Sequence, residues 1–199
     1  MKRSILVWLA LACVAALLVP MFARAHHQDP RDPNDVKGRF DLRRVKTWGS
    51  HPNMGYGLVT YGTWTPRIVW DAGYFIVNVD TFGNKRFDYY AMVRSNGKRM
   101  EGLLFRDRKE KRDYVMRRFK VWRPDKRTVS FRFPWSSVRF PEKRRFFRWN
   151  AQSLYVSDNC PSVCIDKVPD GDALIQTFVR AAPTPTPTPT VTPTVTPTA

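Results

Sequence analysis

Histidine, cysteine and acidic residues are scarce in this chain. The 199 residues include three histidines, three cysteines and 17 aspartates and glutamates, against 34 lysines and arginines. None of the histidines, His26, His27 and His51, is placed as the base of a catalytic triad. The chain also has no Gly-x-Ser-x-Gly, His-Glu-x-x-His or phosphate-binding glycine motif. We therefore expect no catalytic residues and no enzymatic activity.

Long apolar runs are equally scarce, and the single one lies at residues 5–22. Lys2 and Arg3 precede it and small residues around Ala25 follow, an order typical of a secretory signal peptide. We predict that residues 1–25 are such a peptide and that no membrane span remains after cleavage. The alternative is a retained anchor, because 18 apolar residues are close to the shortest length that crosses a bilayer. Cleavage would make the protein secreted or exposed at the cell surface.

The two ends of the remaining chain are poor in core-forming residues. Proline and threonine alternate through most of residues 181–199, which predicts a disordered, extended tail that suits O-linked glycosylation. Residues 26–36 are polar and interrupted by prolines, so they are expected to be a lead-in segment. The predicted folded domain is then residues 37–180, a usual size for one domain.

Only two cysteines, Cys160 and Cys164, lie outside the predicted signal peptide. In an oxidising compartment such a closely spaced pair most often forms a disulfide. Half of a zinc site is the alternative, but it needs two further ligands, and the three histidines are all distant in sequence. We predict a disulfide and no bound cofactor, apart from a possible structural calcium ion.

The positive charge is concentrated in one part of the chain. The net charge is +17 at pH 7, and it falls to +14 without Lys2, Arg3 and Arg24 of the signal peptide. Residues 85–148 hold 22 Lys and Arg against 7 Asp and Glu. Such an excess favours anionic partners such as wall polymers, acidic glycans, lipid headgroups or nucleic acid, and export favours wall or matrix polymers over nucleic acid. The alternative is that these side chains are simply solvated.

Runs of β-branched and aromatic residues, separated by turn residues, predict strands throughout the domain. The clearest hairpin is centred on Asn96-Gly97, a pair typical of a type I′ turn. No long run has the 3.6-residue period of a helix. The expected strands are residues 39–48, 56–65, 74–81, 87–95, 100–105, 115–122, 128–133 and 145–156, with a helical turn at 134–138.

About eight short strands joined by turns predict an all-β, antiparallel sandwich, with a barrel as the alternative. Several basic residues occupy alternate strand positions, so they are expected to line the exposed face of one sheet. These residues are Arg94, Arg106, Arg118, Lys120 and Arg132.

Four short stretches resemble a known type of domain. They are Asp35-Val36-Lys37-Gly38-Arg39-Phe40-Asp41-Leu42-Arg43, Val79-Asp80-Thr81-Phe82-Gly83-Asn84, Trp149-Asn150-Ala151-Gln152-Ser153 and Cys164-Ile165-Asp166-Lys167-Val168-Pro169-Asp170. Such stretches are similar to those of small secreted bacterial domains, chiefly actinobacterial, with immunoglobulin-like sandwiches of the family-9 carbohydrate-binding and DOMON type. The resemblance implies a non-enzymatic binding or surface module. It transfers no ligand, and no haem ligand can be matched.

Two groups of residues are candidates for ligand and metal binding. Trp122 shares a strand face with Arg118 and Lys120, so it is the candidate surface aromatic of a binding site, whereas Trp64 and Trp149 are expected in the core. Oxygen ligands for calcium are available in two places, both of which could equally be plain turns. They are Asp80, Asn84 and Asp88, and an equally loose group of Asp166, Asp170 and Asp172.

Three functions fit these features, in order of preference. The first is an exported module that binds a wall or extracellular polymer, either carbohydrate or polyanion. The second is a structural surface protein without a specific ligand. The third is a small secreted hydrolase, for which Asp80, Asp88 and Glu101 could supply the two carboxylates of a glycosidase.

Overall fold

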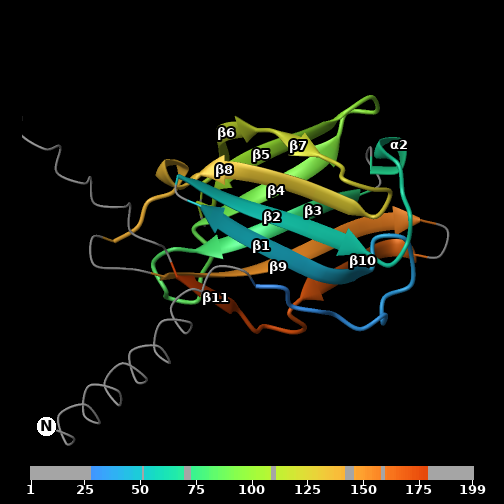
Figure 1. The fold of residues 1–199 in the computed structure, drawn as a ribbon, viewed down its shortest axis with the longest axis horizontal. Coiled ribbons are helices and arrows are strands. Elements are labelled where there is room, and N and C mark those ends of the chain that lie inside the picture. Colours follow the sequence, from blue (N-terminus) through green and yellow to red (C-terminus); the bar gives the residue numbers. More distant parts are fainter. Residues whose placement is uncertain are drawn as a thin grey trace, which may run out of the picture.

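Two antiparallel β-sheets pack face to face and form the body of the protein (Figure 1). The computed structural model describes residues 28–50, 52–69, 73–108, 111–141, 146–157 and 160–178. The predicted all-β sandwich is confirmed, because the strands form two separate sheets. The predicted signal peptide, residues 1–25, and the predicted tail, residues 181–199, lie outside the described residues.

The smaller sheet has the strand order β1-β2-β8-β7, and the larger sheet has the order β10-β9-β3-β4-β5-β6, with β11 also paired to β9. A helical turn that was not predicted, α2 (Pro66–Val69), precedes β3. The predicted helical turn at 134–138 is confirmed as a 3-10 turn at Trp135–Ser137, which follows β8. The strands are β1 (Leu42–Ser50), β2 (Asn53–Thr60), β3 (Gly73–Asp80), β4 (Tyr89–Ser95), β5 (Met100–Arg106), β6 (Tyr114–Phe119), β7 (Val121–Trp122), β8 (Thr128–Pro134), β9 (Phe146–Ser157), β10 (Cys160–Val168) and β11 (Ile175–Phe178).

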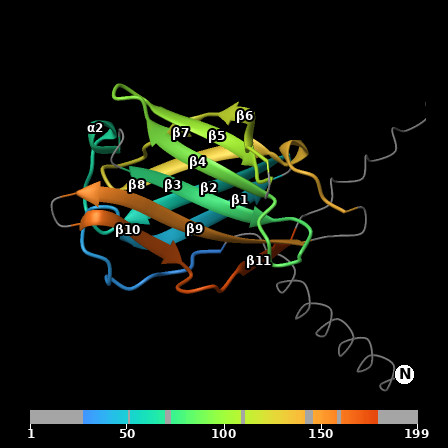
Figure 2. The same cartoon turned by 180° about the vertical axis from the view of Figure 1, so that it is seen from behind.

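The core lies between the sheets and follows the alternation of the strands. In β3, for example, Phe75, Val77 and Val79 are fully buried, while the residues between them are half-buried on the outer side. Burial of each such side chain stabilises the folded state by about 1.5–3 kcal/mol relative to leaving it in water. Trp64 and Trp149 are buried at 2% and 0% exposure, which confirms the expectation that both belong to the core. Figure 2 shows the larger sheet from the side opposite to the smaller one.

The eight predicted strands are all present, but the described residues form eleven. The predicted strand 115–122 is divided at Lys120, because β6 pairs with β5 of the larger sheet and β7 pairs with β8 of the smaller one. Strands β10 and β11 were missed, since Pro161 interrupts the first and the second has only four residues. The hairpin at Asn96-Gly97 is confirmed. Its type I′ turn is not, because Gly97 has a positive φ of 85° whereas Asn96 does not.

The disulfide between Cys160 and Cys164 is confirmed, with their Cα atoms 5.9 Å apart. It closes an irregular start of β10, where the pairing register with β9 shifts between the two cysteines. Cys160 is buried at 1% exposure, so the bridge fastens the edge strand of the larger sheet to the core. A disulfide here leaves no free thiol at either position for a zinc site.

The described part of the predicted lead-in, residues 28–36, is attached to the sandwich. The amides of Val45 and Thr47 donate hydrogen bonds to the carbonyls of Pro30 and Gln28, at 3.0 and 2.9 Å. In the other direction, the amide of Asp32 donates to the carbonyl of Arg43 at 3.0 Å. The segment therefore runs along the free edge of β1 and covers backbone groups that an exposed edge strand would leave unpaired. The folded unit extends N-terminal to residue 37.

Candidate functional site

Trp48 lies on the outer side of the smaller sheet, flat against two glycines of β2. It pairs with Gly55 across the β1–β2 ladder. A Cβ atom at Gly55 would stand 2.8 Å from Cδ1 of Trp48 and closer still to Nε1, and one at Gly57 would stand 3.1 Å from Cζ3. The glycines thus provide a floor on which one face of the indole rests. Trp48 is only half-buried, so part of the ring remains accessible from solvent.

Trp122, the aromatic residue proposed from the sequence, stands beside Trp48. The two ring centroids are 6.2 Å apart and the ring planes are tilted by 57°. Trp122 pairs with Ser130 of β8 and is half-buried. The sequence indicated Trp122 but not Trp48, because the contact between them depends on the order of strands in the sheet. The feature of the sequence that could have indicated Trp48 is the pair of glycines at positions 55 and 57, which leave room for an aromatic ring on the neighbouring strand.

Arg118 and Lys120 lie on the same outer side of the chain as Trp122. The intervening residues Phe119 and Val121 pack against the core, so the three alternate positions face outward. The side chain of Arg118 is 71% exposed, and its Nη1 is 3.7 Å from Oε2 of Glu101. Arg118 belongs to the larger sheet and Trp122 to the smaller one, so this group lies where the chain passes between the sheets.

The prediction that one sheet carries the exposed basic residues is wrong, because they are divided between both. Arg94, Arg106 and Arg118 belong to strands of the larger sheet, and Arg132 belongs to β8 of the smaller one. The alternation of residues predicts on which side of its own strand a side chain lies, but it carries no information on which sheet that strand joins.

The smaller sheet is entirely free of carboxylates. None of its four strands, all within the described residues, contains Asp or Glu. Two rows of paired residues cross the sheet. One row runs from Trp48 through Gly55 to Arg132. The other runs from Lys46 through Gly57 and Ser130 to Trp122. Basic side chains therefore flank the two tryptophans across the sheet, and an anionic ligand placed there would meet no acidic residue of these strands.

A second concave region lies on the outer side of the larger sheet. It is a hollow of about 760 Å³ between the 82–88 loop and the chain that leads into β11. Its floor is polar, and Asn78 Nδ2 donates to Asn150 Oδ1 at 2.9 Å across β3 and β9. Asp172 also lines the hollow, but the amide and basic side chains outnumber its carboxylate, so the hollow also suits a polar, anionic ligand. The lining residues that supply the amide and basic groups are Asn78, Lys85, Arg148, Asn150, Gln152 and Lys167.

The calcium ligands predicted at Asp80, Asn84 and Asp88 form the turn between β3 and β4. Both oxygens of Asp80 accept backbone hydrogen bonds, from Gly83 and from Lys85. Oδ2 of Asp88 accepts from the amides of Thr81 and Phe82, at 2.8 and 3.1 Å. The carboxylates are thus already engaged by the loop itself. These hydrogen bonds agree with the turn interpretation, and a calcium site at the three residues stays a prediction.

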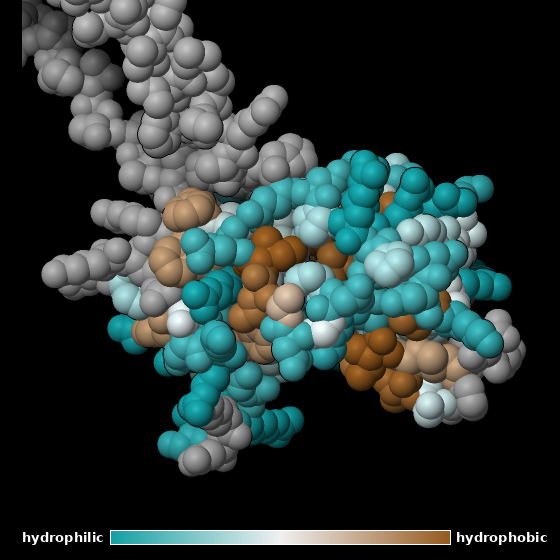
Figure 3. All heavy atoms as spheres, turned by 90° about the horizontal axis from the view of Figure 1, so that it is seen from below, coloured by the Kyte–Doolittle hydropathy of each residue, from teal (hydrophilic) through white to brown (hydrophobic). Residues whose placement is uncertain are grey.

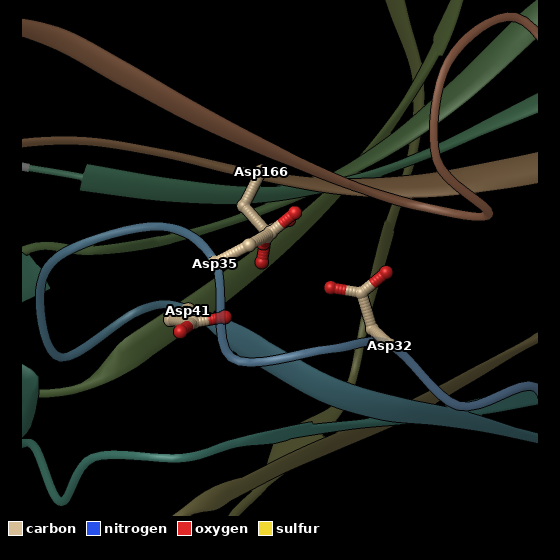
Figure 4. Close-up of side chains that lie close together, drawn as sticks. All are labelled: Asp32, Asp35, Asp41 and Asp166. Atoms are coloured by element: carbon tan, nitrogen blue, oxygen red, sulfur yellow. The ribbon is translucent and has the colours of Figure 1, made fainter.

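A different set of four carboxylates does converge (Figure 4). Asp32 and Asp35 come from the segment before β1, Asp41 immediately precedes β1, and Asp166 lies on β10. One oxygen from each lies within 4.8 Å of the others. Of the second calcium group expected from the sequence, only Asp166 belongs here, whereas Asp170 and Asp172 are exposed. For Asp32, Asp35 and Asp41, the feature of the sequence that could have indicated a cluster is their close spacing in a segment rich in aspartate.

Burial and mutual repulsion raise the pKa values of three members of this acidic cluster, Asp32, Asp41 and Asp166. Burial, followed by the charges of Asp166, Asp170, Asp35 and Asp41, raises the pKa of Asp32 to about 8. Burial and the charges of Asp166 and Asp35 likewise raise the pKa of Asp41 to about 7, against a smaller lowering by the backbone of Val36. The pKa of Asp166 is also raised by burial, although amide hydrogen bonds from Leu42 and Lys167 oppose the shift. The cluster as a whole resists carrying its full negative charge.

The face shown in Figure 3 is mainly hydrophilic, and its apolar side chains form separate patches. Among the described residues no helix is both long enough and apolar enough to cross a membrane. Comparison with known proteins adds no family to these observations: no family model matches the chain, and no match was found among curated proteins.

Proposed function

We propose that the protein is an exported, non-catalytic module that binds an acidic polysaccharide of the cell wall or extracellular matrix. The binding surface is the outer side of the smaller sheet, which we call the tryptophan platform and define as Lys46, Trp48, Trp122 and Arg132. The observation that carries the proposal is the flat placement of Trp48 over Gly55 and Gly57, next to Trp122.

The chemistry of the platform suits a sugar acid. A pyranose ring presents an apolar face that gains free energy by covering an accessible indole, at about 25 cal/mol for each Å² of apolar surface removed from water. Its carboxylate, sulfate or phosphate groups would pair with Lys46 and Arg132, and Lys120 and Arg118 extend the basic surface toward the larger sheet. The lack of acidic residues in these four strands removes the main source of repulsion.

Export is supported by two features of the chain. The N-terminal residues have the order of a signal peptide, and the Cys160–Cys164 disulfide is compatible with an oxidising compartment. The resemblance to family-9 carbohydrate-binding and DOMON-type modules stays a prediction, and it agrees with a non-catalytic sandwich that uses aromatic side chains.

Calorimetric titration of the purified protein with polygalacturonate and with a neutral β-glucan tests the proposal. We expect binding to the polyuronate that weakens as salt is raised, because exposed ion pairs are screened. Trp48→Ala and Trp122→Ala should each lower the affinity about tenfold, corresponding to about 1.4 kcal/mol. Phe82→Ala is the matched control, since Phe82 is an exposed aromatic residue (43%) outside the platform.

The outcomes separate the competing functions. Binding that is unchanged in both tryptophan variants but lost in Arg148→Gln would transfer the site to the hollow on the larger sheet and overturn the platform. Binding to no polymer at all would favour the structural surface protein. Release of reducing sugar ends from either polymer would instead favour the hydrolase.

A further inference from the structure

The acidic cluster joins two parts of the chain that are distant in sequence. Asp41 and Asp166 are separated by 125 positions, yet their carboxylates lie within the same group (Figure 4). The loop before β1 is held against β9 and β10 by several bonds. Tyr155 Oη donates to the carbonyl of Lys37, Ser153 Oγ donates to that of Phe40 at 2.7 Å, and the Leu42 amide donates to Asp166. The convergence of the four side chains is thus built into the packing of the loop.

Two members of the cluster have buried carboxylate oxygens that lack a hydrogen-bond partner of good geometry. Asp41 is 0% exposed, and neither of its carboxylate oxygens has a hydrogen-bond partner of good geometry. Asp32 is 5% exposed, and its Oδ2 also lacks one. Both carboxylates point into the group in Figure 4. Buried polar atoms are nearly always paired, and a buried carboxylate without a partner is especially unfavourable, so these oxygens indicate a missing ligand.

Among the described basic residues, none forms an ion pair that would supply the missing partner. Within the described ranges the ion pairs are Arg44–Asp29, Arg94–Glu101 and Arg118–Glu101, and none involves the cluster. This is notable in a chain with twice as many basic as acidic residues. Four carboxylates so close together repel one another strongly unless they are protonated or a cation lies between them.

We propose that Asp32, Asp35, Asp41 and Asp166 bind one Ca²⁺ ion. All four donors are hard oxygens, without histidine or cysteine, which favours calcium or magnesium over zinc or copper. Calcium takes roughly six to eight oxygen ligands in flexible geometry, and it suits carboxylates from separate segments better than magnesium, which requires near-ideal octahedra. The ion would fasten residues 32–41 to β10. This inference is independent of the tryptophan platform, which lies on the outer side of the smaller sheet.

The test is calcium binding to protein that has been stripped of metal with a chelator. We expect calorimetric titration with CaCl₂ to give about one ion per chain, and we expect saturating calcium to raise the unfolding temperature by about 5–10 °C. Asp41→Asn removes a buried charge and should abolish both effects. Asp35→Asn removes the exposed member of the cluster, so this variant should fold even if Asp41→Asn does not, and it should weaken binding at least tenfold. Asp170→Asn, an exposed acidic residue near the cluster, is the matched control and should bind as the wild type does.

Two results would overturn the proposal. One is the absence of both heat and stabilisation in the wild type at about 10 mM Ca²⁺, which exceeds the dissociation constants of weak extracellular sites. The other is wild-type calcium binding in Asp35→Asn and in any folded Asp41→Asn, which would place the ion elsewhere. Loss of the calcium response in the cluster variants, with the response retained in Asp170→Asn, confirms the site.

Discussion

The indole of Trp48 occupies the space in which a side chain at position 55 would stand. A Cβ atom at Gly55 would lie 2.8 Å from Cδ1 of Trp48. Gly55 has no positive φ, so its backbone does not require glycine. The reason for glycine at this position is the ring that rests on it.

Gly55→Ala is therefore expected to displace Trp48 and to lower the free energy of unfolding by about 1–3 kcal/mol, the usual cost of overpacking. Urea unfolding measures the loss, and polyuronate binding should weaken although no aromatic residue has been removed. Gly49→Ala is the control, because its Cβ would be an ordinary 3.6 Å from Trp135. Equal losses of stability in the two variants would contradict the role of Gly55 as a floor.

Asp88→Ala should destabilise the protein by about 1–3 kcal/mol, because the amides of Thr81 and Phe82 lose their acceptor. Urea midpoints with calcium and with chelator measure the effect. We expect the loss caused by the substitution to be the same in both conditions, since this carboxylate belongs to a turn. A loss of stability that occurs only in the calcium-containing solution would instead support the calcium site predicted at Asp80, Asn84 and Asp88. Asp172→Ala, at an exposed aspartate, should have little effect.

The metal-free protein should become less stable as the pH rises from about 4 to about 8. The pKa values of Asp32 and Asp41 are raised from 3.8 to about 8 and about 7, so in this range the folded state binds more protons than the unfolded state. Their favourable contribution is complete below the unfolded pKa and is lost as the pH passes the folded values.

Urea midpoints of the metal-free protein across this range measure the slope. The charges of Asp35, Asp166 and Asp170 contribute to the raised pKa of Asp32, and the raised pKa of Asp166 itself should change the profile in the same direction. Asp41→Asn should have a flatter profile than the wild type, because it no longer takes up a proton on folding. A wild-type profile that rises toward pH 8 would contradict the shifts.

Reduction of the Cys160–Cys164 disulfide should lower the free energy of unfolding by roughly 2 kcal/mol, the loop-closure value for so short a ring. Comparison of urea midpoints with and without a thiol reductant gives this quantity. The Cys160→Ala/Cys164→Ala double variant provides the control, and its midpoint should not respond to the reductant. If the wild type is equally insensitive, then the bridge contributes nothing to stability.

Most strands could be predicted because their evidence is local. The alternation around Phe75, Val77 and Val79 repeats every two residues and ends at turn residues, so any window of the sequence contains the whole signal. β10 and β11 were not predicted, because each is defined by its pairing with β9. Locally, Pro161 interrupts the pattern of β10, and β11 is too short to show one. The disulfide was predictable for the same reason as the strands, since its two cysteines are neighbours.

The candidate sites were less predictable because each joins distant segments. Trp122 was identified from its own strand, but its contact with Trp48 depends on β2 and β8 lying between them in the sheet. The acidic residues 32, 35 and 41 were read as part of a polar segment and the start of the domain. Only the packing of that segment against β9 and β10 shows that they surround Asp166.

Composition, cysteine spacing and local periodicity by themselves predicted the all-β class, the Cys160–Cys164 bridge, the burial of Trp64 and Trp149 and the common face of Arg118, Lys120 and Trp122. Tertiary structure alone decided which sheet each basic residue joins, which glycines lie beneath Trp48 and which carboxylates converge. The physical reason is the range of the interactions. Strand alternation and a short disulfide ring are properties of neighbouring residues, whereas the platform and the acidic cluster arise where pairing and packing bring together residues as far apart as Asp41 and Asp166.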